Sequence, residues 1–197
     1  MTVSANLLAI VPAAFLYALI ILAVRFDLKS RRIPNWLVAS GALLGIFLHA
    51  VVPGGEGFFS PNHGGLGAMA AVQGWALGLI LLMPMYALRT LGAGDVKLIA
   101  AIGAFFGPVP ILAITVLSMV CGGVLAIVVS LWNRNLLHVL ANVRFMMVNA
   151  VMRGVAGDFG GIDKPANSTG KLPYAVAIAA GTMLYIVLLK FSLKVFS

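Results

Sequence analysis

Two of the chain's five carboxylates lie in sequence settings that could support hydrolysis. Asp27 follows an apolar stretch and precedes a basic cluster, and Asp95 follows Gly92-Ala93-Gly94 and precedes another apolar stretch. If the segments that carry them pack together, the two carboxyl groups share a proton, because neighbouring carboxylates do not both ionise easily. One then acts as an acid and the other as a base at the same pH, which is the chemistry needed to add water to a peptide carbonyl.

The residues around Asp95 favour this interpretation without requiring it. Gly92 and Gly94 lack a Cβ, so the backbone there can adopt positive φ and a substrate strand can approach closely. Lys97 could bias the acid pair towards ionisation or extend towards lipid headgroups. Each acid also has a plainer interpretation: Asp27 as one counter-ion in a basic cluster, and Asp95 as the N-cap of a helix after a turn.

The other acids are weaker candidates. Asp158 and Asp163 fall in a glycine-rich stretch, 154–170, and could meet a basic substrate segment, although Lys164 would offset their charge. Glu56 is expected at the opposite side of the molecule. We therefore keep Asp158 and Asp163 as substrate-proximal candidates and leave Glu56 out of the site.

The sequence contains no motif typical of a metal site, a cofactor site or a serine hydrolase. Cys121 is the only cysteine, so an intrachain disulfide and a cysteine-based zinc site are excluded. No Gly-x-Ser-x-Gly motif is present. The histidines show no i, i+4 pairing; they are His49, His63 and His138. We expect no metal and no cofactor.

The composition identifies the environment in which these acids must work. Of the 197 residues, 62% are hydrophobic and only 9% charged, and the mean hydropathy is +1.09. A soluble domain has about a quarter of its residues charged, so this is an integral membrane protein. The net charge of +8 comes from residues that flank apolar stretches, which indicates contact with a lipid bilayer rather than with nucleic acid.

The apolar stretches predict an all-α membrane bundle of about six transmembrane helices, forming a single domain over residues 1–197. Pro34 is suited to the first turn of the second helix. The fourth stretch is too short to cross a bilayer, so it either continues past the prolines that follow with a kink or is shielded by its neighbours. Residues 133–153 predict an amphipathic helix in the membrane interface. The expected spans are 6–24, 34–52, 68–88, 96–107, 111–131 and 174–189.

The basic residues predict the orientation of this bundle. Eleven of the 13 lysines and arginines fall in three alternate connections, and only Lys190 and Lys194 fall on the other side. Basic connections stay in the cytoplasm. Both termini should therefore lie outside a cell's inner (plasma) membrane, with Asp27 and Asp95 at its cytoplasmic face.

Two motifs together resemble those of the bacterial type IV prepilin peptidases, which are membrane aspartic proteases with a Gly-x-Gly-Asp signature. The first is Asp27-Leu28-Lys29-Ser30-Arg31-Arg32-Ile33-Pro34-Asn35, and the second is Gly92-Ala93-Gly94-Asp95-Val96-Lys97-Leu98. A weaker third likeness is Lys171-Leu172-Pro173-Tyr174-Ala175, similar to the start of the family's last helix. The likeness covers most of the chain in layout.

The resemblance implies a catalytic pair, Asp27 and Asp95, that cuts a prepilin after a glycine, just before its apolar segment, on the cytoplasmic side. Pro34, Asn35 and Lys97 are implied as supporting motif residues, and Pro173 as a residue near the substrate. Larger members also methylate the new N-terminus and carry paired Cys-x-x-Cys motifs, which this chain lacks. It therefore resembles the peptidase-only type that serves Flp or Tad pili, with pilus assembly machinery as a further partner in protein secretion.

Three alternatives remain at this level. Archaeal preflagellin peptidases share the acid pair and the short length. Presenilin-like proteases share Gly-x-Gly-Asp, but the chain lacks their Pro-Ala-Leu segment. A non-enzymatic assembly subunit or transporter would use the acids to bind ions, and it would line a cavity that reaches both sides of the membrane rather than hold them at one boundary.

Overall fold

The computed structural model describes residues 2–88, 90–132 and 173–195, together with Ala141, Arg144, Phe145 and Val148. Six helices make up most of these residues, so the expected all-helical class is confirmed. Four of them contain a stretch that is long and apolar enough to cross a membrane: Ile10–Ser30, Ala68–Ala87, Pro108–Trp132 and Tyr174–Ser192. The helices are α1 (Thr2–Ser30), α2 (Asn35–Val51), α3 (Ala68–Ala87), α4 (Ala93–Phe106), α5 (Pro108–Trp132) and α7 (Tyr174–Val195).

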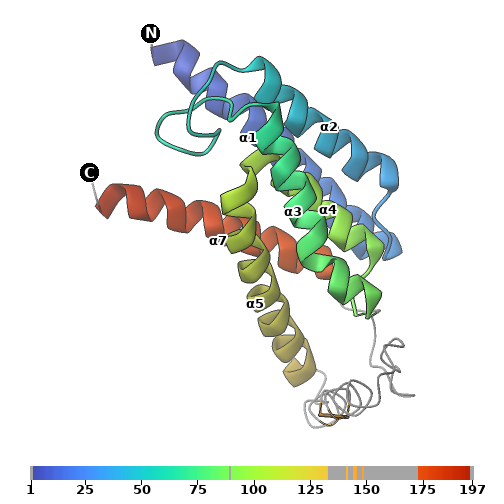
Figure 1. The fold of residues 1–197 in the computed structure, drawn as a ribbon. Coiled ribbons are helices and arrows are strands. Elements are labelled where there is room, and N and C mark those ends of the chain that lie inside the picture. The colour runs from blue at the N-terminus through green and yellow to red at the C-terminus, as the bar shows by residue number, and fades with distance from the viewer. Residues whose placement is uncertain are drawn as a thin grey trace.

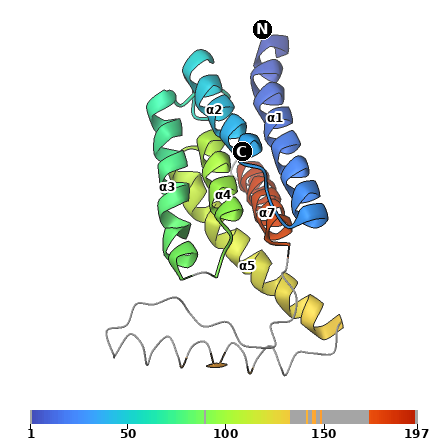
Figure 2. The same ribbon diagram turned by 90° about the vertical axis from the view of Figure 1, so that its right-hand side faces the viewer.

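The helices α1 to α4 run side by side, and α5 and α7 pack against each other and cross at an angle to these four (Figures 1 and 2). Successive helices among α1 to α5 run in opposite directions. As a result, α1 and α3 end where α2 and α4 begin, and α7 also begins there. We call this the Asp end, because Asp27 and Asp95 both lie in helix turns at it.

The first helix is longer than the apolar stretch 6–24. It continues to Ser30, which places Asp27 in its last turn. Arg31 follows the helix, and its φ of 54° is the left-handed conformation that commonly terminates one. Pro34 is extended and directly precedes α2, one residue earlier than its expected place in the first helical turn.

The short helix α4 is shielded by its neighbours, which was one of the two arrangements left open by the sequence. Its 14 residues cover roughly 21 Å, whereas a bilayer core needs about 30 Å. Val96 and every residue from Leu98 to Phe106 are buried, and α4 contacts all five other described helices. The chain then turns at Gly107, with φ of 82°, and α5 begins as a separate helix at Pro108.

Glycines let α4 approach its two closest neighbours. A Cβ added to Gly78 of α3 would lie 2.8 Å from the Cα of Ala100. One added to Gly45 of α2 would lie 3.0 Å from the backbone carbonyl of Ala104. Small residues at helix contacts are typical of membrane bundles, where close van der Waals packing drives association.

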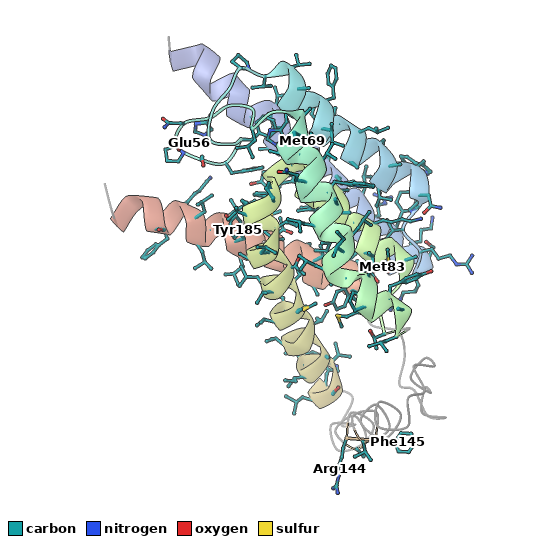
Figure 3. All side chains as sticks on the ribbon, viewed as in Figure 1. Glu56, Met69, Met83, Arg144, Phe145 and Tyr185 are labelled. Carbon is teal, nitrogen blue, oxygen red and sulfur yellow. The ribbon has the colours of Figure 1, made fainter. Side chains whose placement is uncertain are left out.

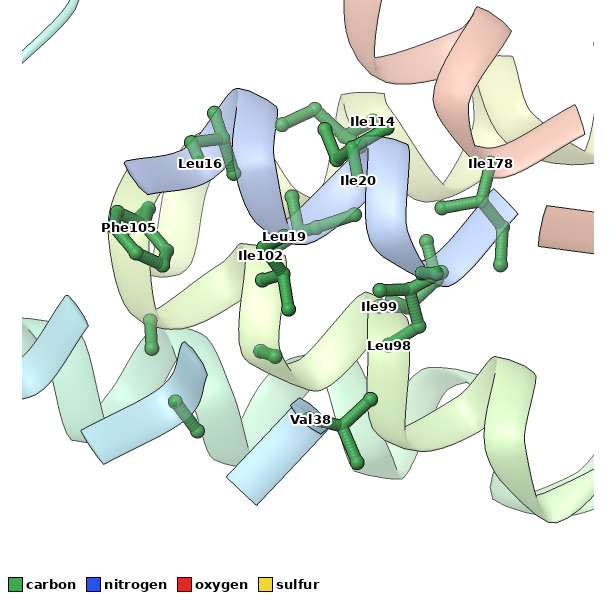
Figure 4. Close-up of a cluster of buried hydrophobic side chains, with 14 of the residues drawn as sticks. Leu16, Leu19, Ile20, Val38, Leu98, Ile99, Ile102, Phe105, Ile114 and Ile178 are labelled. Carbon is green, nitrogen blue, oxygen red and sulfur yellow. The ribbon is translucent and has the colours of Figure 1, made fainter. Parts of the chain in front are cut away.

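The middle of the bundle is filled by aliphatic and aromatic side chains (Figure 4). Leu16 of α1, Ile99 of α4 and Ile114 of α5 are each fully buried in this cluster. Ile178 of α7 is also fully buried there. The cluster separates the Asp end from the other end of the molecule.

At that other end, the connection between α2 and α3 folds back over the bundle. His49 is fully buried; its Nε2 lies 3.0 Å from the Phe105 carbonyl oxygen, and its Nδ1 accepts the Leu66 N–H at 2.9 Å. One ring nitrogen thus accepts and the other donates, which is the pattern of a neutral imidazole. Figure 3 shows Glu56 on this connection, remote from Met83 near the other end of α3.

Part of the sequence-based prediction falls outside the described residues. Of the interfacial helix expected at 133–153, only Ala141, Arg144, Phe145 and Val148 are described, in helical conformation and exposed. The acids at 158 and 163 also lie outside the described residues. Both expectations therefore stay predictions.

Candidate active site

Asp27 is buried at the junction of α1 and α7. Only 7% of the residue is exposed, and its Oδ2 accepts the backbone N–H of Ala175 at 3.1 Å. The basic residues nearest to it in sequence, Arg25 and Lys29, are exposed. An exposed ion pair in a juxtamembrane cluster therefore does not describe its surroundings.

Asp95 occupies the third position of α4, in the first turn. Its Oδ2 accepts the N–H of Gly92, the residue that precedes the helix, at 3.2 Å. An acid in this turn interacts favourably with the positive end of the helix dipole. The capping role foreseen as the plainer alternative is thus present in part: Asp95 satisfies one free N–H, although Gly92 rather than Asp95 occupies the N-cap.

The two carboxyl groups are close enough to interact. Burial and, secondly, the charge of Asp27 raise the pKa of Asp95 from 3.8 to about 6, against the smaller opposing effect of the Gly92 hydrogen bond. Asp95 lies outside the four apolar stretches that could cross a membrane. A carboxyl with this pKa can hold or release a proton near neutral pH, as an acid–base pair requires.

The glycines before Asp95 act differently from the sequence-based expectation of positive φ. Gly92 is extended, with φ of −78°, and Gly94 is helical. What both provide is space: a Cβ on Gly94 would lie 3.2 Å from the Cβ of Ile33, and one on Gly92 would lie 3.0 Å from Asp95 Oδ2. The lack of a side chain, rather than an unusual backbone angle, lets the two motif segments meet here.

A side-chain hydrogen bond joins the two motifs directly. The ammonium of Lys97 donates to the side-chain oxygen of Asn35 at 2.9 Å. Asn35 is the first residue of α2 and follows Pro34. The sequence offered two roles for Lys97, biasing the acids or reaching headgroups; the contact with Asn35 is a third, which fixes the start of α2 against α4.

The first turn of α7 also reaches this site; the sequence marked residues 171–175 as a weaker likeness and Pro173 as near the substrate, but it gave no role to Tyr174 or Ala175. Pro173 precedes the helix, Tyr174 lies close enough to Asp95 to interact with its charge, and the Ala175 N–H binds Asp27. One signal for this was in the sequence: a proline directly before an apolar stretch marks a helix start, and the first N–H groups of a helix have no partner within it.

The described residues hold no group of three or more histidine, cysteine, aspartate or glutamate side chains that could bind a metal ion. His49 is engaged in hydrogen bonds at the other end of the molecule. Among the described residues, the Asp end brings together two carboxyl groups, backbone N–H groups, Lys97 and Tyr174.

Comparison with known protein families shows which family the chain belongs to. Residues 13–127, more than half of the chain, match the type IV leader peptidase family. The chain belongs to this family. The leader peptidase match contains both acid motifs and ends within α5, so α7 lies beyond it. No curated protein and no solved structure matched the chain significantly.

Proposed function

We propose that this leader peptidase is an aspartic endopeptidase that removes the short basic leader from type IV prepilins. The observation that carries the proposal is the meeting of Asp27 and Asp95, from two segments far apart in sequence, close enough for one charge to raise the pKa of the other carboxyl. Both acids fall within the part of the chain that matches the family.

The arrangement supports hydrolysis through a shared proton. One carboxylate removes a proton from water while the water oxygen bonds to the scissile carbonyl carbon, and the other carboxyl protonates the carbonyl oxygen. The resulting diol breaks its C–N bond as the amide nitrogen receives a proton. The nitrogen receives the proton that the first carboxylate took from water and the second acid recovers a proton from the diol, so the two acids end as they began.

The position of the acids also favours a protease over a transporter. Both lie at one end of the bundle, and the core cluster of Leu16, Ile99, Ile114 and Ile178 fills the middle. A transporter site lies near the membrane midplane and alternates between the two sides. A peptidase that receives its substrate from one side needs access from that side only.

We further propose the finer assignments that the sequence favours. The substrate is a prepilin of the Flp or Tad type, cut after a glycine at the cytoplasmic face of the inner membrane, and both termini of the peptidase lie outside. The chain acts as one membrane-embedded peptidase domain without methyltransferase activity, since it has one cysteine and no paired Cys-x-x-Cys motif. Its partners are the prepilin, the bilayer and the pilus assembly machinery.

A cleavage assay in lipid tests the proposal. Wild type, Asp27→Asn, Asp95→Asn and the control Glu56→Gln are incubated with a Flp-type prepilin, and the products are identified by mass spectrometry. We expect one cut after the leader glycine with wild type and Glu56→Gln, and a loss of at least a hundredfold in both aspartate variants. Substantial turnover by either aspartate variant would contradict the acid pair; cleavage of a preflagellin but not of prepilins would replace the substrate.

A further inference from the structure

The first turn of α7 contacts the acid pair from outside the family-matched part of the chain. The hydrogen bond from the Ala175 N–H to Asp27 is buried, and Ala175 itself is fully buried. It joins residues 148 positions apart in the sequence. The last helix is therefore a part of the site rather than only a cover for the bundle.

The two carboxyl groups are treated differently by their surroundings. The carboxylate of Asp27 faces the start of another helix, where a free N–H and the positive end of the helix dipole stabilise negative charge. Asp95 receives its N–H from exposed Gly92, over a longer distance of 3.2 Å. Burial and the charge of Asp27 outweigh that bond and raise the pKa of Asp95.

The ionisable groups around the pair come from several elements. Asp95 and Lys97 belong to α4, and Tyr174 belongs to α7. Lys97 is bound to Asn35. The basic side chains of Arg31 and Arg32, between α1 and α2, are exposed. Among the described residues, the donor that hydrogen-bonds to Asp27 is the buried N–H of Ala175.

We propose that the first turn of α7 fixes the roles of the two acids: the Ala175 N–H holds Asp27 as the carboxylate that deprotonates water, and Asp95 carries the proton that goes to the scissile carbonyl oxygen. This rests on the proposed function. Asp27 gains the water proton as the C–O bond forms and passes it to the leaving nitrogen as the C–N bond breaks. Asp95 gives its proton to the carbonyl oxygen and recovers one from the diol. Ala175 is a positioning residue, because it acts through Asp27.

Ala175→Pro removes the donor while fitting the first helical turn, where an N–H has no partner within the helix. The matched control is Val109→Pro, at the same second position of α5 and remote from the acids. We expect Ala175→Pro to shift the acidic limb of the kcat/KM profile upwards by about one pH unit, which is a tenfold loss of kcat/KM at low pH. The KM should be unchanged. The reason is that a hydrogen bond to a charged group stabilises the charged form by about tenfold. Val109→Pro should retain the wild-type profile. An unshifted profile in an active Ala175→Pro would overturn the proposal.

A second measurement does not depend on the folding of Ala175→Pro or on activity. Infrared difference spectra at pH 5 detect the carbonyl stretch of a protonated carboxyl group in wild type, Asp27→Asn and Asp95→Asn. We expect this band to persist in Asp27→Asn and to be lost in Asp95→Asn; the reverse would overturn the assignment. If both variants still cleaved prepilin, the proposed function itself would fail, whereas inactive variants with the reverse spectra would remove only the assignment of roles.

Discussion

Asp95 holds a carboxyl group where ionisation costs free energy. Its pKa is about 6 in the folded protein and 3.8 ordinarily, so between these pH values the folded chain keeps a proton that the unfolded chain releases. The folded state is therefore destabilised as the pH rises from about 4 to about 6, and the penalty persists above that range. A buried carboxyl with a raised pKa lowers the stability of the folded protein, and such groups are typical of functional sites.

Asp95→Asn should remove this penalty. An asparagine can still accept the Gly92 N–H, but it carries no charge to bury beside Asp27. We expect the variant to be more stable than wild type by about 1–3 kcal/mol at pH 7.5, because one pKa unit corresponds to about 1.4 kcal/mol, and equal to wild type at pH 3.5. Thermal unfolding in mild detergent at both pH values measures this, with Glu56→Gln as the control. A variant that is less stable than wild type at pH 7.5 would contradict the prediction.

The hydrogen bond between Lys97 and Asn35 should contribute a modest coupling between the two motifs. Both side chains are exposed, so we expect a coupling free energy of about 0.5–1 kcal/mol in a double-mutant cycle of Lys97→Ala and Asn35→Ala. Unfolding in denaturant gives the four free energies. The matched cycle of Asn35→Ala with Lys190→Ala, at the far end of α7, should show no coupling. Equal coupling free energies in the two cycles would mean that the hydrogen bond between Lys97 and Asn35 does not contribute to stability.

Single residues were predictable from the sequence where their chemistry is in the side chain. Asp27 and Asp95 stand out because acids are rare in an apolar chain, and their neighbours form recognisable motifs. Ala175 does not stand out, because its contribution is a backbone N–H, which every residue except proline has. The angle at Gly92 was also not predictable, since glycine permits both signs of φ.

At the scale of the elements, the fit of α4 between its neighbours decides where Asp95 lies. From Leu98 onwards the helix is buried, in close contact with α2 and α3, and this contact depends on the absence of side chains at glycines such as Gly78 and Gly45. Adding even one methyl group at such a contact lowers stability, because the interior is close-packed and a backbone atom moves only if its whole helix moves.

Two identical substitutions should therefore have opposite effects. Gly78→Ala places a Cβ 2.8 Å from the Cα of Ala100, so α3 must move, and we expect a loss of about 1–3 kcal/mol and weaker cleavage. Gly123→Ala in α5 meets no atom within 4 Å, so the better helix propensity of alanine should leave stability unchanged or raise it by up to about 1 kcal/mol. Thermal unfolding and the cleavage assay compare the pair. A Gly78→Ala variant as stable and active as Gly123→Ala would show that the contact is not required.

The existence of the helices was predictable, whereas their mutual burial was not. Apolar stretches bounded by charged residues and prolines indicate helices because a bilayer leaves the backbone no other partner for its N–H and C=O groups. Such a stretch does not reveal which helix is surrounded by others. The short length of α4 was the one available hint, and only the contacts with five neighbours show that shielding, rather than a kinked longer helix, accounts for it.

At the scale of the whole molecule, the direction of insertion decides which compartment the acids face. Helix ends alternate, so Ser30, the last residue of α1, lies at the Asp end, and Asn62 lies in the connection at the other end. The orientation follows from the basic residues near the Asp end. The excess of lysine and arginine there predicts a cytoplasmic location for Ser30 and an external one for Asn62.

Cysteine labelling in intact cells tests this orientation. Cys121 is first replaced by alanine, and Ser30→Cys and Asn62→Cys are then introduced singly, both at exposed positions. A maleimide that does not cross membranes should label Asn62→Cys in intact cells, and Ser30→Cys only after the membrane is permeabilised. Both variants must retain cleavage to show that the fold is preserved. Labelling of Ser30→Cys alone in intact cells would place the acids outside, where a cytoplasmic prepilin leader does not reach them.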